Sequence, residues 1–349
     1  MANQHTDKHS VIAFYAPLKS PFHATPSGDR EIARLFMRAL ELSGHRVELA
    51  SQLRSYDRGD PQRQLRIEAL AKREATRIVK RWQRAGTIPI AWFSYHLYYK
   101  APDLIGPHVA KALNIPYLVA EASRSEKRAN GPWAHYHNCV DHALRCARKV
   151  ICINPVDIIA LRAYFAALGR NQRTLESIPV FIDARPCAAS PNDILKHKLA
   201  TRIGLDPHKP WLITIAMMRS GDKFSSYQHL AKSLSQLNRD YQCLIVGSGP
   251  CETEVRALFE PNKQVFFAGL LENTTLRNYL PAFDILAWPA INEALGMVFL
   301  EAANAGVAVV AGDSGGVSSI VSHGETGLLC KPGDNAAMTQ HLETLLDDK

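Results

Sequence analysis

Short runs of apolar residues alternate with stretches of helical spacing along this chain, and each run has the length of a buried strand. The first run, residues 11–16, is followed by helical spacing over residues 29–43, which Gly44 ends. Further strands are expected at residues 45–50, 89–95, 115–120 and 149–153. Strands that alternate with helices predict an α/β fold with a doubly wound parallel sheet.

The alternation restarts after residue 177, beyond a proline-rich stretch that has no helical period. In this second half, strands are expected at residues 211–216, 241–246, 264–268, 284–288 and 306–311. A chain of 349 residues is long enough for about two domains. We therefore predict two Rossmann-like domains, over residues 1–185 and 186–349, that face each other across a cleft. Open α/β sheets bind ligands at the carboxyl ends of their strands.

Composition excludes several other classes of protein. No apolar stretch approaches the ~18 residues of a membrane span, and the first ten residues lack the apolar core of a signal peptide. We expect a cytoplasmic chain, in which the seven cysteines, without a CxxC pair, are reduced packing residues. The net charge of +8 favours an anionic partner such as a nucleotide, a nucleic acid or a lipid surface.

The most informative motif is the segment NEALGMVFLE, which holds Glu293 and Glu301 with Gly296 between them. A helix that starts near Gly296 would offer unpaired N–H groups to an anion, and the missing side chain would let a phosphate approach. Glu301, one turn later, is placed to accept hydrogen bonds from ribose hydroxyls, and Glu293 from sugar hydroxyls. The alternative is that both acids merely flank a helix, but the apolar neighbours of Glu301 make an unpaired carboxylate costly.

A longer segment around this motif, NEALGMVFLEAANAGVAVVAGDSGGVSSIVSHGETGLL, resembles the E-x7-E signature region of the retaining family 4 glycosyltransferases. The resemblance is strongest over residues 213–334 and covers most of the chain. It implies the GT-B fold and transfer of a sugar from a nucleoside diphosphate sugar to a hydroxyl acceptor, a glycan or a lipid-linked glycan. It also implies a role in polysaccharide, lipopolysaccharide or glycolipid biosynthesis. No DxD-like motif is present, so we expect no metal and no cofactor besides the donor substrate.

The resemblance implies roles for individual residues. Glu301 would bind the ribose and Glu293 the donor sugar, while the diphosphate would lie on the backbone of Gly296, Met297 and Val298. The family's basic pair corresponds to Arg219 and Lys223 in IAMMRSGDKF, although Met218 replaces the usual glycine and the spacing is four rather than five. Gly247 in VGSGP would line the donor pocket. This segment is no dinucleotide fingerprint, because Glu252 stands where a third glycine is needed.

The N-terminal half carries weaker signals. Gly28, Asp29 and Arg30 fall in the first strand-to-helix loop, near the expected donor phosphate and acceptor. His96 follows the strand at residues 89–95. Relatives carry a histidine after the next strand, but this chain has Glu121 there. Either His96 or Glu121 could contact the acceptor or the donor sugar, and each could equally be a satisfied structural group.

Positive charge concentrates between residues 54 and 84, where ten Arg or Lys accompany four acids. Apolar residues recur there at helical spacing: Ile67, Leu70, Ala71, Ile78, Val79 and Trp82. We predict an amphipathic basic helix and favour a solvated outer face that packs through this stripe. The alternative is docking on an anionic membrane, at its inner face. No nucleic-acid-binding module is present, so we expect no nucleic acid partner.

Two other functions remain open. A nucleotide-sugar epimerase of the same fold would need an acid and a base rather than an acceptor pocket. The other is a noncatalytic nucleotide-sugar or glycan-binding protein, and the presence of Glu293, Glu301, Arg219 and Lys223 argues against it. GT-B chains usually end with a helix that crosses back to the first domain, and we expect that helix to be missing after Asp334.

Overall fold

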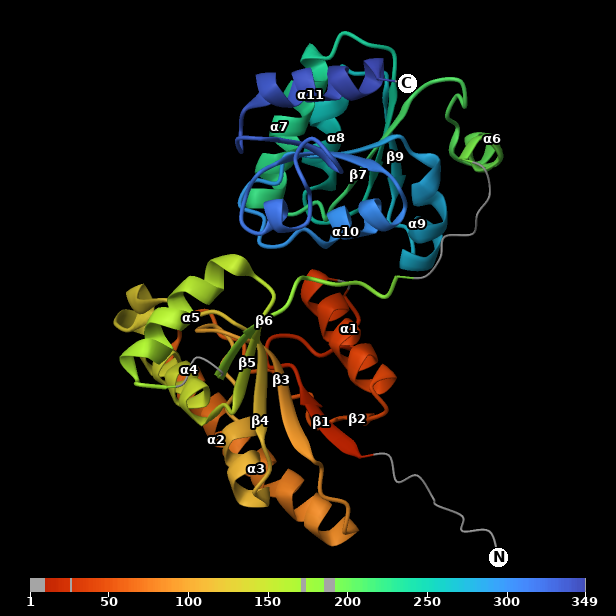
Figure 1. The fold of residues 1–349 in the computed structure, drawn as a ribbon. Helices are drawn as coiled ribbons and strands as arrows, with labels where there is room; N and C mark the ends of the chain where they lie inside the picture. The colour runs from red at the N-terminus through yellow and green to blue at the C-terminus, as the bar shows by residue number, and fades with distance from the viewer. Residues whose placement is uncertain (1–9, 26, 171–173, 185–191, 349) are drawn as a thin grey trace, which may run out of the picture. The chain divides into compact units, whose positions relative to one another are not determined.

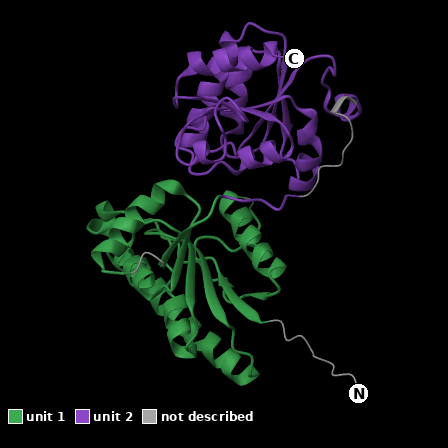
Figure 2. Ribbon diagram, viewed as in Figure 1, with its two compact units in different colours: residues 1–179 green, residues 180–349 purple. Residues whose placement is uncertain are grey.

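The computed structural model describes residues 10–25, 27–170, 174–184 and 192–348. The chain forms two compact units, residues 1–179 and residues 180–349, shown in green and purple in Figure 2. Each unit is described by itself. The boundary that the sequence predicts between residues 185 and 186 lies outside the described residues.

Unit 1 contains a six-stranded parallel sheet in the order β2-β1-β3-β4-β5-β6. Helix α1 covers one face of this sheet, and α2, α3 and α4, which pack side by side, cover the other (Figure 1). The strands are β1 (Val11–Tyr15), β2 (Arg46–Leu49), β3 (Ala91–Leu97), β4 (Tyr117–Ala122), β5 (Lys149–Cys152) and β6 (Leu175–Ser177). The helices are α1 (Gly28–Leu42), α2 (Pro61–Ala85), α3 (Gly106–Leu113), α4 (Ala134–Cys146) and α5 (Pro155–Ala167).

Unit 2 repeats the design with the strand order β12-β11-β10-β7-β8-β9, again all parallel. Helices α7, α8 and α11 lie on one face of the sheet, with α9 and α10 on the other (Figure 1). The strands are β7 (Trp211–Ile215), β8 (Gln242–Val246), β9 (Val265–Gly269), β10 (Ile285–Trp288), β11 (Ala308–Gly312) and β12 (Gly327–Cys330). The helices are α6 (Asn192–Ile203), α7 (Asp222–Gln236), α8 (Glu252–Phe259), α9 (Asn273–Tyr279), α10 (Met297–Asn304) and α11 (Asn335–Asp347).

The strand order of each sheet reverses at one point. In unit 1 the first strand, β1, pairs with both β2 and β3, so the reversal lies between β1 and β3. In unit 2 the first strand, β7, pairs with β8 and β10, so the reversal lies between β7 and β10. The connections diverge at such a switch point and leave room for a ligand at the carboxyl ends of the strands.

Helix α2 is the basic helix predicted from the sequence. Asp60 caps its start by accepting from the Gln62 N–H at 3.0 Å, and Gly86 ends it. The buried stripe consists of Ile67, Ala71, Ala75, Ile78 and Trp82, together with Gln64. Leu70, which the sequence places in that stripe, is instead 50% exposed. Because the stripe packs against the core of unit 1, the result fits the solvated-face interpretation, and docking on anionic lipid stays a prediction.

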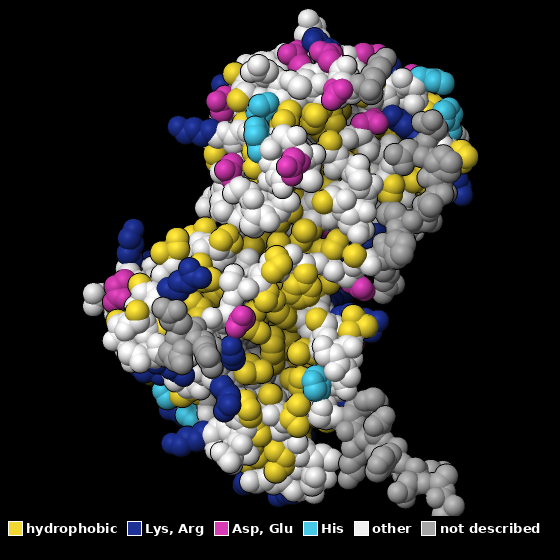
Figure 3. All heavy atoms as spheres, in the orientation of Figure 1, with side chains coloured by type: hydrophobic (Ala, Val, Ile, Leu, Met, Phe, Trp, Pro, Cys, Tyr) yellow, Lys and Arg dark blue, Asp and Glu magenta, His cyan; other side chains and the backbone are white. Residues whose placement is uncertain are grey.

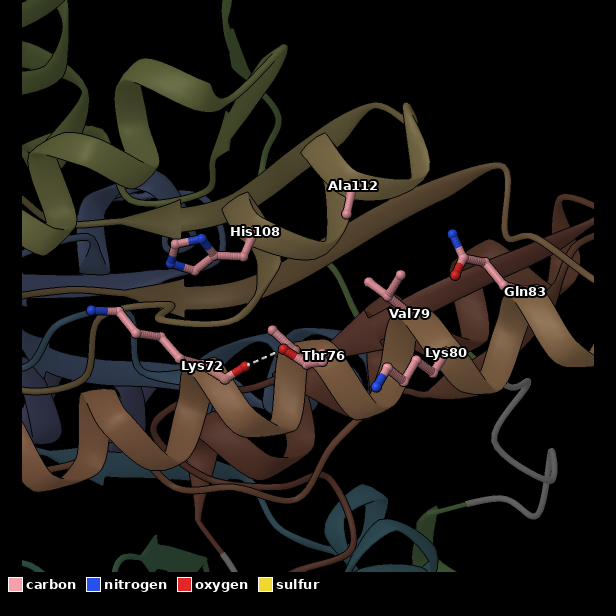
Figure 4. A pocket seen from close by; sticks show the side chains of 8 residues that line it. Lys72, Thr76, Val79, Lys80, Gln83, His108 and Ala112 are labelled. Atoms are coloured by element: carbon pink, nitrogen blue, oxygen red, sulfur yellow. Dashed lines mark hydrogen bonds between the residues drawn. The ribbon is translucent and has the colours of Figure 1, made fainter.

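The surface around α2 combines cations with a shallow pocket. On the face of unit 1 visible in Figure 3, hydrophobic side chains gather in the middle, and Lys and Arg lie toward the margin. A pocket of about 520 Å³ lies between α2 and α3, with Lys72, Thr76 and Lys80 on one side and His108 and Ala112 on the other (Figure 4). Across the described ranges, no helix is long and apolar enough to cross a membrane.

Candidate functional site

Lys223 and Glu293 form an ion pair at the switch point of unit 2. Lys223 lies in the first turn of α7, which follows β7, and Glu293 lies in the loop that follows β10. Lys223 Nζ donates to Glu293 Oε2, and the side chains are only 22% and 17% exposed. Trp288 Nε1 donates to the same carboxylate oxygen at 3.3 Å, and Lys223 Nζ lies 5.2 Å from the Trp288 ring centroid. The sequence predicted both charged residues but neither their pairing nor Trp288.

The loop that carries Glu293 is fixed at both ends. The Ile291 N–H donates to Ser226 Oγ at 3.0 Å, which ties the start of the loop to α7. Near its end, the Ala294 carbonyl accepts from the Gly316 N–H at 2.9 Å, in the turn that follows β11. A group held by neighbouring elements in this way loses little further entropy when it binds a ligand.

Helix α10 begins where the sequence predicts, with Gly296 as its N-cap. Gly296 has a φ of +71°, and a Cβ there would lie 2.5 Å from the Phe299 ring and 3.4 Å from Glu293 Cγ. No side chain caps this helix. The N–H groups of Met297 and Val298 have no acceptor within the helix, whereas the Phe299 N–H donates to the Gly296 carbonyl at 2.9 Å. Glu301 lies in the next turn and is half-buried. The Glu293 side chain therefore lies directly beside a helix N-terminus that can receive an anion.

Gly247 follows β8 and permits a close approach to the loop after β7. A Cβ at Gly247 would lie 1.9 Å from the Ala216 carbonyl oxygen. The same loop is held further along, where the Met218 N–H donates to the Ser248 carbonyl at 2.9 Å. Arg219 is next in the chain and is exposed, and within the described ranges no carboxylate is paired with it. The structure therefore brings Lys223 to Glu293 but does not bring Arg219 to it.

His96 and Asp29 make the corresponding contact in unit 1. His96 Nδ1 lies 2.9 Å from Asp29 Oδ1, which joins β3 to the first turn of α1 across the switch point. Glu121 lies in β4 next to His96, because the register Tyr95 with Ala120 resumes as Leu97 with Ala122. Both His96 and Glu121 have positive φ values, 64° and 58°. Such values are costly for residues other than glycine and occur mainly at functional sites.

Burial and neighbouring charges shift the pKa values of His96 and Glu121. Burial lowers the pKa of His96, but the hydrogen bond and charge of Asp29, with Glu121 and Asp157, outweigh it and raise the pKa above its ordinary value. Burial raises the pKa of Glu121 to about 7, with His96 opposing and Asp157 adding to the shift. The sequence did not single out Asp157, although it lies in the first turn of a helix after a predicted strand. The pKa values of the His96 imidazole and of the Glu121 carboxyl are thus both above their ordinary values.

The sequence predicted Gly28, Asp29 and Arg30 to lie in the loop before the first helix, although the helical spacing already starts at residue 29, and the loop assignment was wrong. They form the first turn of α1, because Ser27 caps the helix by accepting from the Arg30 N–H. Arg30 Nη1 donates to the His23 carbonyl at 2.9 Å, so this side chain helps to hold the loop after β1. Of the three, Asp29 alone contacts another predicted site residue.

Comparison with known proteins identifies the C-terminal part of the chain. Residues 209–348 match the family described as glycosyl transferases group 1. They belong to that family. The matched segment contains every site residue predicted in unit 2, from Arg219 to Glu301.

Two curated relatives are similar over longer segments. The chain is 26% identical over 257 residues to the 2-deoxystreptamine glucosyltransferase of Streptomyces kanamyceticus, which covers 70% of this chain and 65% of the relative. It is 35% identical over 204 residues to the GDP-mannose-dependent monoacylated alpha-(1-6)-phosphatidylinositol monomannoside mannosyltransferase of Corynebacterium glutamicum, covering 54% and 51%. The chain thus spans between half and two thirds of the length of these relatives.

Solved glycosyltransferase structures share the fold of both units. Anabaena HepE, solved in complex with UDP-glucose, superposes with a TM-score of 0.66 at 18% identity and covers 97% of this chain and 90% of its own. The fold of the chain is therefore GT-B, as the sequence predicted. Within the described ranges, no group of three or more His, Cys, Asp or Glu is arranged to hold a metal ion.

Proposed function

We propose that this group 1 chain transfers a hexose from a nucleoside diphosphate sugar to a hydroxyl group of an acceptor, with retention of configuration at the sugar. One observation carries the proposal. The Lys223–Glu293 pair lies beside the uncapped N-terminus of α10, at the switch point of the group 1 domain. A cation, a carboxylate and a helix N-terminus in one place suit the diphosphate and the hydroxyls of a nucleotide sugar.

The diphosphate lies against the first turn of α10. The N–H groups of Met297 and Val298 bind phosphate oxygens, and Gly296 leaves room for them because it has no side chain. Lys223 exchanges its contact with Glu293 for the diphosphate, and Arg219 approaches from the exposed loop before α7. Both cations then stabilise the negative charge that develops as the diphosphate leaves.

The two carboxylates of unit 2 hold the neutral parts of the donor. Glu293, released by Lys223, accepts hydrogen bonds from hydroxyls of the sugar and stays oriented by the indole N–H of Trp288. Glu301, one turn into α10, accepts from the ribose hydroxyls. Gly247 lines the same pocket. Positioning of the sugar and stabilisation of the leaving group supply most of the rate enhancement.

The acceptor hydroxyl is bound by unit 1. Asp29, His96 and Glu121 lie at the carboxyl edge of the unit 1 sheet and provide donors and acceptors for it. The relatives include a phosphatidylinositol monomannoside mannosyltransferase and a 2-deoxystreptamine glucosyltransferase. A role in polysaccharide, lipopolysaccharide or glycolipid synthesis fits a hydroxyl-bearing acceptor of this kind.

The test is turnover by Glu293→Gln beside a matched control. Purified wild type is incubated with UDP-, GDP- and ADP-hexoses and a panel of glycan acceptors, and both the released nucleoside diphosphate and the glycosylated product are measured. We expect transfer by wild type, a loss of about 10²–10³ in kcat for Glu293→Gln, and unchanged kcat for Glu254→Gln, whose carboxylate is exposed on α8. Epimerised donor without acceptor, or binding without turnover of any donor, would overturn the proposal.

A further inference from the structure

Three loops of unit 1 bring three tyrosines and three cations together at the carboxyl edge of its sheet. The loops follow β2, β3 and β4, which lie in the same sheet. We call the group the tyrosine–cation platform, and it consists of Tyr56, Tyr98, Tyr99, Arg54, Lys100 and Arg128. None of these residues belongs to the donor site described above.

Each cation of the platform lies over a tyrosine ring. The Arg54 guanidinium is 4.6 Å from the Tyr56 ring centroid, and its Nε donates to the Leu18 carbonyl at 2.8 Å. Arg128 and Lys100 lie 4.9 and 5.7 Å from the Tyr99 ring centroid. Such contacts hold long side chains in place before a ligand arrives and leave other N–H groups free to donate.

The rings themselves form a continuous series. The centroid of Tyr99 is 5.5 Å from that of Tyr98 and 5.2 Å from that of the buried Trp133. The loop after β2 is fastened to them, because the Asp57 N–H donates to the Lys100 carbonyl at 2.9 Å. At the end of the ring series opposite Trp133, the Tyr98 and His96 ring centroids are 4.8 Å apart. The platform is therefore continuous with the residues proposed to bind the acceptor hydroxyl.

In contrast to several cations of unit 1, the platform cations have no acidic partner within the described ranges. Arg63, Arg81 and Arg124 pair with Asp57, Glu48 and Asp141. Within the described ranges, no carboxylate pairs with Arg54, Lys100 or Arg128. Three preordered cations without counter-charges attract an anion, and guanidinium groups match the oxygens of a phosphate. Tyrosine faces with hydroxyls suit a sugar ring, which has apolar and polar surfaces.

We propose that the tyrosine–cation platform binds a phosphate group carried by the sugar acceptor. The proposal rests on the proposed function, which places the acceptor hydroxyl at His96, Glu121 and Asp29. The acceptor sugar lies along Tyr98 and Tyr99, with its reactive hydroxyl toward His96 and its phosphate toward Arg54, Lys100 and Arg128. The chain therefore selects phosphorylated over neutral acceptors.

The first experiment measures binding of glucose 6-phosphate and of glucose to the full chain by calorimetry. We expect glucose 6-phosphate to bind at least about tenfold more tightly than glucose. The variant Arg54→Gln/Lys100→Gln/Arg128→Gln should lose that advantage. Its matched control, Arg66→Gln/Arg73→Gln/Arg84→Gln, removes three exposed charges from α2 and should bind within about twofold of wild type. Equal losses in both variants, or no loss in either, would overturn the proposal.

A variant with two substitutions instead of three controls for a folding defect, because Arg54 also donates a hydrogen bond to the Leu18 carbonyl. Lys100→Gln/Arg128→Gln leaves that hydrogen bond intact. It should keep the thermal unfolding midpoint of wild type and still weaken glucose 6-phosphate binding several-fold. Unchanged affinity in this variant would contradict the assignment of the phosphate to the platform.

The phosphate can come from a free sugar or from a lipid headgroup, and a vesicle arm separates the two. Vesicles of phosphatidylcholine with phosphatidylinositol are compared with phosphatidylcholine alone by co-sedimentation. Platform-dependent binding to the inositol-containing vesicles, with free inositol 1-phosphate a weak competitor, assigns the phosphate to a lipid. Effective competition assigns it to a free sugar phosphate. Vesicle binding that the platform variant retains in full would contradict a lipid source.

Nucleotide binding, measured on the same samples, keeps the two proposals separate. The platform variant should bind UDP, GDP or ADP as wild type does, because the donor residues lie in unit 2. Glucose 6-phosphate binding without any nucleotide binding would reject the proposed function and leave the platform in place. Nucleotide binding without selection for phosphorylated sugars would reject the platform alone.

Discussion

Lys223 contacts two different groups in unit 2, the Glu293 carboxylate and the face of the Trp288 ring. Its ammonium is held where the proposed diphosphate leaves the sugar. Replacement by Gln removes the charge but keeps a side chain of similar length. We expect Lys223→Gln to lower kcat by about 10²–10³, measured in steady state with a saturating donor. Lys232→Gln, a like change farther along α7, is the control and should leave kcat unchanged.

Glu121 gives a prediction that concerns pH. Its pKa is about 7 in the folded chain, against an ordinary value of 4.5, because it is buried. The folded state therefore binds more protons than the unfolded state between these values, and stability from this group falls as the pH rises through that window. Glu121→Gln should gain up to about 3 kcal/mol in unfolding free energy relative to wild type between pH 4.5 and pH 7.5.

Urea unfolding at several pH values checks this difference. Glu41→Gln, at the exposed end of α1, is the control and should show no such dependence. A Glu121→Gln variant whose stability parallels wild type at every pH would mean that Glu121 ionises normally in the folded chain.

For single residues, the sequence could predict candidates for the site but not the contacts that they make. Glu293 could be named from the motif around Gly296, Lys223 from the family resemblance, and His96 from its place at the end of a predicted strand, which in the structure extends to Leu97. Their partners could not be named, because the ion pair joins residues 70 positions apart and the His96–Asp29 contact joins residues 67 apart. The hydrogen bonds of Arg30 to the His23 and Ala24 carbonyls could not be predicted either, because they depend on the conformation of the loop after β1. The roles of these residues in catalysis stay predictions.

At the scale of elements, the start of α10 depends on one residue. Gly296 has a left-handed backbone, and a Cβ there would overlap the Phe299 ring, whereas Gly306 has nearly the same φ with no atom within 4 Å. Gly306→Ala should lower the free energy of unfolding by about 1 kcal/mol because of its backbone conformation alone. Gly296→Ala should lower it by about 1–3 kcal/mol more because of the overlap, as thermal unfolding would show. Gly296→Ala should also weaken nucleotide binding, as calorimetry would show. Equal effects of the two variants would mean that a side chain at position 296 meets no steric overlap.

Elements also differ in how well their sequence predicts them. The ten expected strands and the start of α10 are confirmed, because buried parallel strands are apolar throughout and a glycine precedes the helix. The edge strands β6 and β12 were not expected. They have only three and four residues, LES and GLLC, and lie in segments rich in turn residues. Runs this short carry no measurable period.

In the part of the chain that the structure describes, each unit has its own hydrophobic core, and the two cores share no residue. The core of unit 1 draws on residues between Ala13 and Phe165, and that of unit 2 on residues between Leu199 and Leu342. We expect two calorimetric unfolding transitions. A nucleotide at a hundred times its Kd should stabilise one of them by about 2.7 kcal/mol, and this transition should be that of unit 2. A shift of the other transition alone would place the donor in unit 1.

Nucleotide binding is the most direct test of whether unit 2 holds a nucleotide sugar through α10 and its neighbours. UDP, GDP, ADP and their hexoses are titrated into wild type, Glu301→Ala and the control Glu325→Ala by calorimetry. We expect wild type and the control to bind one base selectively and Glu301→Ala to bind it at least about tenfold more weakly. Equal affinity in all three proteins, or no binding to wild type, would contradict this expectation.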